Sequence, residues 1–155
     1  PPRSTLFPYT TLFRSCMKIL VIDDDPAMTD LLKMILVSSD AEVTSANSAS
    51  EGLEKIKQTN PGIVILDLML PDMDGWQITT EIRKFSTVPI LILSVIDNPG
   101  LVARALDAGA DDYLIKPAAR NMLIAHINNL TRRRTSFDDN SPSFPINVEP
   151  FLSGS

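Results

Sequence analysis

The sequence has 155 residues, of which 44% are hydrophobic, and its 14 Lys and Arg against 19 Asp and Glu give a net charge of −5. This length predicts one compact domain and excludes two large ones. The longest apolar runs span four to six residues, far short of the roughly 20 that a membrane helix needs. The single cysteine, Cys16, excludes an internal disulfide and a cysteine-built zinc site. The negative charge disfavours nucleic acid as a direct partner.

The two ends of the chain differ in composition from its middle. Six of the 12 prolines lie outside residues 17–134, a segment with 12 basic and 16 acidic residues. We therefore expect the folded domain to span 17–134. Residues 1–16 contain a near-repeat, STLF and TTLF, that resembles translated sequencing-adapter sequence, and a natural disordered leader is the alternative. Residues 135–155 are rich in Ser, Pro and Asn and are expected to form a linker or a truncated tail.

Five short β-rich segments alternate with helical periodicity along the domain. The predicted strands are residues 18–23, 42–45, 63–67, 89–93 and 112–115. Four of them are nearly unbroken Ile, Leu and Val, which is typical of parallel strands covered by helices on both faces. The alternation predicts an α/β fold.

The first two predicted helices carry clear start signals. Pro26 stands in the first turn of one helix, and apolar residues repeat at helical spacing from Met28 to Leu36. Ser48 and Glu51 form a capping box for the second helix.

The remaining three helices are predicted mainly from their ends. The third begins after Asp74-Gly75 and runs to about residue 84, and the fourth spans about 99–108 and stops at Gly109. An arginine cluster at 132–134 is expected to close the fifth, since cations are favourable at a helix C-terminus. Five βα units of this length predict a flavodoxin-like, doubly wound parallel sheet of order 2-1-3-4-5. Its site should lie where strands 1 and 3 end.

Carboxylates gather at that predicted edge. Asp23, Asp24 and Asp25 follow the first strand, and Asp67 ends the third. Like charges at such a site repel, so either some protons are retained or a cation is bound. Oxygen ligands with room for water favour Mg²⁺.

Two further side chains belong to the same edge. Ser94 follows the fourth strand and Lys116 follows the fifth. A hydroxyl donor and an ammonium beside a metal would complete a pocket for one phosphoryl group.

With these residues in place, the chain resembles a response-regulator receiver domain of two-component signalling from residue 17 to about 134. The segment LDLMLPDMDG at residues 66–75 carries much of the likeness. The resemblance implies that Asp23, Asp24 and Asp67 bind Mg²⁺ together with the backbone carbonyl of Met69. It also implies that Asp67 is the phosphoacceptor.

The resemblance further assigns Ser94 and Lys116 to the chemistry and Ser94 and Tyr113 to the switch, with a cis bond between Lys116 and Pro117. Asp67 is expected to accept a phosphoryl group from a sensor histidine kinase in a Mg²⁺-dependent reaction. The new charge would then alter the surface of helix 4, strand 5 and helix 5 to control an output, which we expect to be transcription. We expect this protein to be a cytoplasmic phosphoprotein and not an enzyme, although it would assist its own phosphorylation and dephosphorylation.

The subfamily is indicated by a charge pattern. Arg104, Asp111 and Asp112 resemble the residues through which receivers of winged-helix transcription factors form homodimers when phosphorylated. Ala118 and His126 depart from that pattern. DNA contact is expected only through an output domain outside these 155 residues, and no membrane partner is expected.

The same residues bear on three other functions. Asp23-x-Asp25 is similar to the catalytic pair of haloacid-dehalogenase-type phosphatases, but Ala27 stands where that pattern has Thr or Val. The acidic loop disfavours a flavin or nucleotide binder. A phosphorylation-independent, receiver-like binding module is the remaining alternative.

Three other aspartates are given structural interpretations. Asp25 and Asp74 are interpreted as helix caps and Asp72 as part of a turn.

Overall fold

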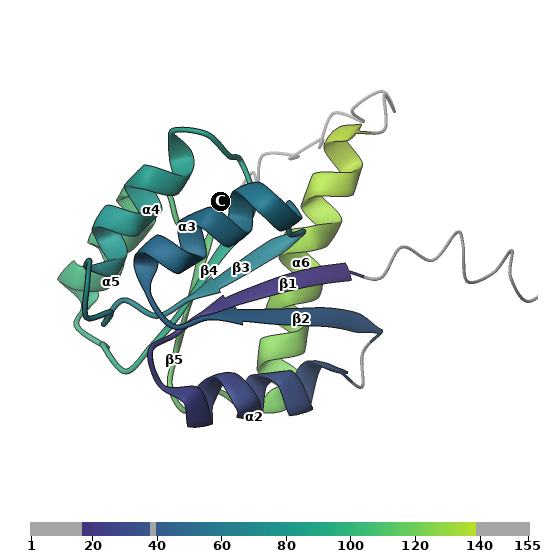
Figure 1. The fold of residues 1–155 in the computed structure, drawn as a ribbon, viewed down its shortest axis with the longest axis horizontal. Coiled ribbons are helices and arrows are strands. Elements are labelled where there is room, and N and C mark those ends of the chain that lie inside the picture. The colour runs from purple at the N-terminus through teal and green to yellow at the C-terminus, as the bar shows by residue number, and fades with distance from the viewer. Residues whose placement is uncertain (1–16, 38–39, 139–155) are drawn as a thin grey trace, which may run out of the picture.

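The computed structural model describes residues 17–37 and 40–138. They form a five-stranded parallel sheet in the order β2-β1-β3-β4-β5, which confirms the predicted topology. The strands are β1 (Met17–Ile22), β2 (Ala41–Ala46), β3 (Ile63–Leu66), β4 (Ile90–Ser94) and β5 (Asp112–Ile115). Figure 1 shows this sheet lying between two layers of helices.

Alternate residues of the central strands face two separate hydrophobic cores. The helices are α2 (Pro26–Val37), α3 (Ala49–Thr59), α4 (Gly75–Arg83), α5 (Pro99–Asp107) and α6 (Arg120–Asp138). Leu20 and Ile22 of β1 pack into the core under α3, α4 and α5. Ile19 and Val21 pack into the core under α2 and α6. Because side chains alternate along a strand, an unbroken apolar segment fills both cores at once.

The element boundaries differ from the predicted ones by a few residues. β2 is one residue longer at each end than predicted, and β3 ends at Leu66, so Asp67 stands just beyond the strand. The arginine cluster at 132–134 does not close α6, which continues to Asp138. No proline or glycine interrupts residues 135–138, so nothing local stops the helix at the arginines. The predicted leader at 1–16, with Cys16, and residues 139–155 lie outside the described part of the chain.

Local side-chain contacts explain where the helices begin. Ser48 Oγ accepts the Glu51 amide at 3.2 Å, while Glu51 accepts the amide of Asn47 at 3.0 Å. The predicted capping box is thus present, with its second bond displaced by one residue. Asp25 accepts the Ala27 amide at 3.0 Å at the start of α2, which matches its interpretation as a cap.

One helix ends at a position that requires glycine. Gly109 follows α5 with a φ of +118°, and an added Cβ would lie 2.8 Å from the Cγ of Arg83. This backbone conformation is open to glycine but strained for other residues.

None of the helices in the described residues combines the length and the hydrophobicity that a membrane span needs.

Candidate functional site

Three carboxylates converge where β1 and β3 end. Asp23 and Asp24 follow β1, and Asp67 follows β3 with its amide bound to the Ile22 carbonyl at 2.9 Å. One carboxylate oxygen from each aspartate lies within 4.8 Å of the other two. Asp23 and Asp67 are buried, with 3% and 9% of their surface exposed, whereas Asp24 is exposed. The parallel sheet therefore brings the predicted acidic residues into one cluster that stays open to solvent at Asp24.

Lys116 bridges the two buried carboxylates. Its Nζ lies 2.7 Å from Asp23 Oδ2 and 3.1 Å from Asp67 Oδ2. The lysine follows β5, its amide donates to the Ser94 carbonyl at 2.9 Å, and its bond to Pro117 is cis. Burial by itself would lower the pKa of Lys116, but the hydrogen bonds to Asp23 and Asp67 outweigh burial and raise the pKa above its usual value. The ammonium therefore stays charged at neutral pH.

The donor set suits a hard divalent cation. Three carboxylates face a single ammonium in this cluster, which leaves negative charge uncompensated. Their ligand atoms are all oxygen, and the exposed Asp24 leaves room for water molecules, as Mg²⁺ prefers. The residues present therefore fit the Mg²⁺ ion that the sequence predicts.

Met69 and Ser94 lie beside this cluster. The Met69 amide donates to Asp67 Oδ1 at 3.1 Å, so Asp67 is held at one oxygen by Met69 and at the other by Lys116. Ser94, the last residue of β4, is fully buried. Its hydroxyl accepts the Ile96 amide at 3.4 Å, which is long for a hydrogen bond.

Tyr113 lies on the neighbouring strand β5 and contacts Ile96, in the loop between β4 and α5. Its hydroxyl donates to the Ile96 carbonyl. Burial raises the pKa of Tyr113, a hydrogen bond with Ser94 opposes that change, and the charges of Asp67 and Asp97 add to it. The phenol is therefore neutral at physiological pH and remains a hydrogen-bond donor to the loop between β4 and α5.

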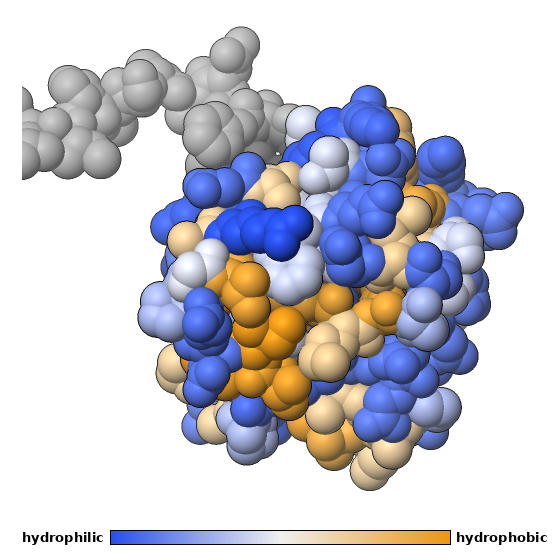
Figure 2. All heavy atoms as spheres, turned by 90° about the vertical axis from the view of Figure 1, so that its left-hand side faces the viewer, coloured by the Kyte–Doolittle hydropathy of each residue, from blue (hydrophilic) through white to orange (hydrophobic). Residues whose placement is uncertain are grey.

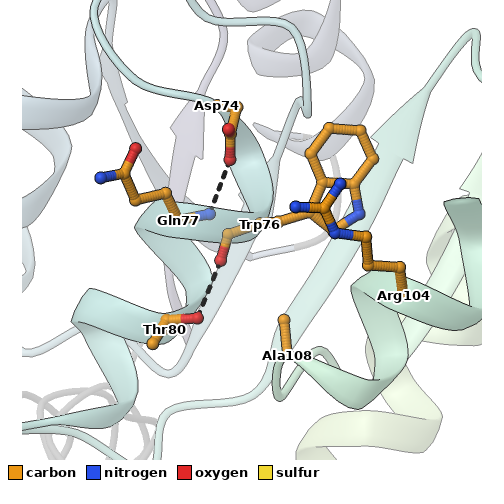
Figure 3. A pocket seen from close by; sticks show the side chains of 6 residues that line it. All are labelled: Asp74, Trp76, Gln77, Thr80, Arg104 and Ala108. Carbon is orange, nitrogen blue, oxygen red and sulfur yellow. Dashed lines mark hydrogen bonds between the residues drawn. The ribbon is translucent and has the colours of Figure 1, made fainter.

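Arg104 of α5 lies over Trp76 of α4, outside the acidic cluster. The guanidinium is 4.9 Å from the centre of the Trp76 ring, and the indole nitrogen donates to the Leu101 carbonyl at 3.2 Å. The two side chains border an open hollow of about 310 Å³ between α4 and α5, lined by Asp74, Trp76, Gln77, Thr80, Arg104 and Ala108 (Figure 3). Asp74 accepts the Gln77 amide at 2.8 Å there, which agrees with its interpretation as a helix cap.

Asp111 and Asp112 both have partners within the chain. Asp111 Oδ2 accepts from Arg83 Nη2 and from the Ile90 amide, each at 2.8 Å. Asp112 contacts the Nδ1 atom of His126 on α6, and both side chains are partly buried. Of the three predicted dimer residues, Arg104 and Asp111 thus contact side chains of α4, and Asp112 contacts α6.

The structure also joins residues whose contacts no motif in the sequence predicts. Arg83 donates to the carbonyls of Val88 and Gly109 besides Asp111, at 2.7 and 3.0 Å. Burial lowers the pKa of Arg83, and the charge of Asp111 opposes that change. Asp72 binds the first turn of α3, more than 20 residues away in sequence. No local spacing signals such contacts, because the partners come from separate βα units.

Hydrophobic side chains are exposed near the site. Met69 lies two residues after Asp67 and Val95 directly follows Ser94, and they have 57% and 60% of their surface exposed. Figure 2 looks onto the side of the molecule where β1 leads into α2 and shows hydrophobic residues gathered there among hydrophilic ones. Exposed apolar side chains thus follow closely in sequence after Asp67 and Ser94.

A doubly wound sheet of order 2-1-3-4-5, with carboxylates beyond β1 and β3 and a lysine beyond β5, defines the class of receiver domains. The model of the family described as "Response regulator receiver domain" matches residues 19–128. The chain belongs to this family.

Relatives and solved structures agree with that assignment. "Response regulator protein GraR" of Staphylococcus haemolyticus is 40% identical over 121 residues, which cover 78% of this chain and 54% of the relative. "Transcriptional regulatory protein KdpE" of Staphylococcus aureus is 37% identical over 127 residues, 82% of this chain and 55% of the relative. The crystal structure of a two-component response regulator from Clostridium difficile has a TM-score of 0.74 and 33% identity over 76% of this chain and 98% of that one. The chain spans about half the length of the curated relatives it matches.

Proposed function

We propose that this receiver domain accepts a phosphoryl group on Asp67 from the phosphohistidine of a sensor histidine kinase, in a Mg²⁺-dependent reaction in the cytoplasm. The observation that carries the proposal is the contact of Lys116 with both Asp67 and Asp23 inside a cluster of three carboxylates. A cation site and a fixed ammonium around one buried carboxylate are what transfer of an anionic group to that carboxylate requires.

A carboxylate oxygen of Asp67 attacks phosphorus, the bond between phosphorus and the histidine nitrogen breaks, and an acyl phosphate forms. The Met69 amide and Lys116 hold the two Asp67 oxygens, so the nucleophile is positioned before the donor arrives. Mg²⁺ held by Asp23, Asp24, Asp67 and the Met69 carbonyl would neutralise charge on the phosphoryl oxygens. The same groups would assist hydrolysis of the acyl phosphate, because they would stabilise the phosphoryl group equally when water attacks phosphorus and Asp67 leaves.

Phosphorylation would reach the surface through β4 and β5. The Lys116 ammonium contacts Asp67 directly, and Ser94 accepts the Lys116 amide with its carbonyl. Both side chains would bind the new phosphoryl oxygens after phosphorylation. Ser94 and Tyr113 both bind the backbone of Ile96. A shift of Ser94 towards Asp67 would therefore disturb this loop and the position of Tyr113, biasing the α5–β5–α6 surface.

The names and lengths of the relatives suggest which process the domain controls. Matched proteins are named transcriptional regulators and are about twice as long as the matched segment. We propose that the domain controls transcription through a separate output domain, and that its phosphorylated form pairs through the surface that carries Arg104, Asp111 and Asp112. Because Asp111 and Asp112 already bind Arg83 and His126, pairing would require these contacts to be shared or exchanged.

Intact mass after incubation with Mg²⁺ and acetyl phosphate tests the phosphorylation. The full chain is expected to gain about 80 Da, the mass of one phosphoryl group. The matched control is Asp67→Asn, which keeps the shape of the side chain but removes the nucleophilic carboxylate, and a second control replaces Mg²⁺ with EDTA. An adduct that persists on Asp67→Asn contradicts the proposal. A folded chain that gains no mass and shows no amide shifts with beryllofluoride would favour the phosphorylation-independent binding module.

A further inference from the structure

The loop between β3 and α4, residues 67–74, is held near its ends by one bond to the Asp67 side chain and one bond between backbone groups. The Met69 amide donates to Asp67 at 3.1 Å, and the Gly75 amide donates to the Leu68 carbonyl at 2.9 Å. A Cβ atom on Gly75 would lie 2.4 Å from the Cα of Leu68, so this close approach requires glycine. The exposed middle of the loop is attached to a different element.

Asp72 makes that attachment. Its Oδ1 accepts the Ala49 amide at 2.9 Å, and its Oδ2 accepts the Ser50 amide at 3.1 Å and the Ser50 hydroxyl at 3.0 Å. Ala49 and Ser50 open α3, where backbone amides have no acceptor within the helix. A carboxylate at this end also interacts favourably with the helix dipole. The loop that follows the phosphoacceptor is therefore bound to α3 through one side chain.

Helix α3 is tied in turn to the strand end that carries Asp23. The Asp23 amide donates to the carbonyl of Ala46 at 3.1 Å, and Ala46 ends β2 just before α3 begins at Ala49. The bond between Asp72 and Ala49 therefore closes a ring of contacts. The ring runs from Asp23 through the connection between β2 and α3, across Asp72, and along the loop to Asp67.

We propose that Asp72 is a positioning residue for the magnesium site: by binding the first turn of α3, it holds the 67–74 loop, and with it the Met69 backbone, against Asp67. The inference rests on the proposed function, because the Met69 carbonyl is a ligand of the proposed metal site. Hydrogen bonds from the Ala49 and Ser50 amides lower the pKa of Asp72, so its carboxylate remains a full acceptor at neutral pH.

Asp74 provides a matched control in the same loop. It is also an exposed aspartate at a helix start, but it accepts the Gln77 amide of its own helix α4. Asp72→Ala and Asp74→Ala therefore remove the same charge and one helix cap each. Only Asp72→Ala releases the loop from α3.

The test measures the Mg²⁺ dissociation constant of the full chain by titration calorimetry, with no phosphodonor present. Asp72→Ala is expected to bind Mg²⁺ about tenfold more weakly, which is the scale seen when residues that orient metal ligands are removed. Asp74→Ala is expected to stay within about twofold of the wild type. Asp72→Asn retains one oxygen acceptor and is expected to fall between the two. The amides of Ala49 and Ser50 should exchange hydrogen faster in both Asp72 variants.

An unchanged Mg²⁺ affinity in Asp72→Ala, or an equal loss in Asp74→Ala, overturns the proposal. If Asp72→Ala does not fold, the comparison of Asp72→Asn with Asp74→Asn decides by the same criterion. Failure of the proposed function is separable from both results, because it would appear as a wild-type chain that binds Mg²⁺ but gains no phosphoryl mass.

Discussion

The ammonium of Lys116 lies 2.7 Å from the carboxylate of Asp23. A side chain proposed to bind the phosphoryl group thus neutralises a carboxylate proposed to bind the metal. A divalent cation that approaches Asp23 meets the positive charge of Lys116, and the two cations repel each other in a site that is largely shielded from solvent. Lys116 is therefore expected to lower the affinity of the cluster for Mg²⁺ while it favours the transfer step.

Lys116→Met separates these two effects. We expect the variant to bind Mg²⁺ about tenfold more tightly, since removal of one nearby positive charge is worth at least about 1.4 kcal/mol at this range. Phosphorylation by acetyl phosphate should nevertheless be slower at saturating Mg²⁺. Calorimetry and intact mass measure the two quantities. Lys84→Met is the control, because Lys84 pairs with Glu81 on the exposed end of α4. Weaker Mg²⁺ binding in Lys116→Met would contradict the expected competition.

The convergence of the site could be predicted from the sequence because it depends only on strand order. Asp23 and Asp67 each follow a strand that ends in buried apolar residues, and Lys116 follows the partly exposed edge strand β5. The carboxyl ends of parallel strands meet at one edge. Once the order 2-1-3-4-5 is inferred, the cluster follows without knowledge of any side-chain conformation. The fold itself was predictable because four of its five strands are marked by nearly unbroken Ile, Leu and Val.

Contacts between separate helices and loops could not be predicted in this way. Arg83 reaches Asp111 across 28 residues, and Asp72 reaches Ser50 across 22. Which partner a long side chain selects depends on how neighbouring βα units are rotated and spaced, and no periodicity encodes that geometry. In the sequence, Asp72 looks like an ordinary turn residue. Its partners on α3 become apparent only when the loop is packed against that helix.

Arg83 is expected to stabilise the fold through the contacts that the sequence did not indicate. Arg83→Ala removes donors to Gly109, Val88 and Asp111 and should lower the free energy of unfolding by about 2 kcal/mol. Arg83→Lys should recover little of the loss, because an ammonium cannot replace the planar fork. Urea unfolding followed by circular dichroism measures both variants. Full recovery by lysine would show that charge alone matters at this position.

Tyr113→Phe tests the contact between β5 and the loop after β4. The variant loses the hydrogen bond to the Ile96 carbonyl but keeps the ring, so the free energy of unfolding should fall by about 1 kcal/mol. Hydrogen exchange at Ile96 and Asp97 is expected to become faster, since the loop loses an anchor. Exchange that changes equally throughout the described residues would instead indicate a global loss of stability with no particular effect on this loop.

Arg104→Ala tests the proposed pairing of the phosphorylated domain. Sedimentation of the beryllofluoride-treated wild type is expected to show a concentration-dependent dimer, which the variant should form at least about tenfold more weakly if Arg104 makes an interfacial ion pair. Lys57→Ala is the matched control, because Lys57 lies over the Phe85 ring at 4.8 Å much as Arg104 lies over Trp76. An activated wild type that stays monomeric at high concentration, or an equal loss in Lys57→Ala, contradicts the proposed surface.

The carboxylate of Asp72 predicts a pH dependence whose sign is fixed by its contacts. The amides of Ala49 and Ser50 hold the pKa of Asp72 below its usual 3.8 in the folded chain. A depressed folded-state pKa contributes stability that is fully present above the unfolded value and is lost as the pH falls through the folded value. The difference in unfolding free energy between the wild type and Asp72→Asn should therefore be constant from about pH 8 to about pH 5 and shrink below pH 3.8. Urea titrations across this range measure it, and a difference that stays constant or widens in acid would mean that the charge of Asp72 does not stabilise the loop.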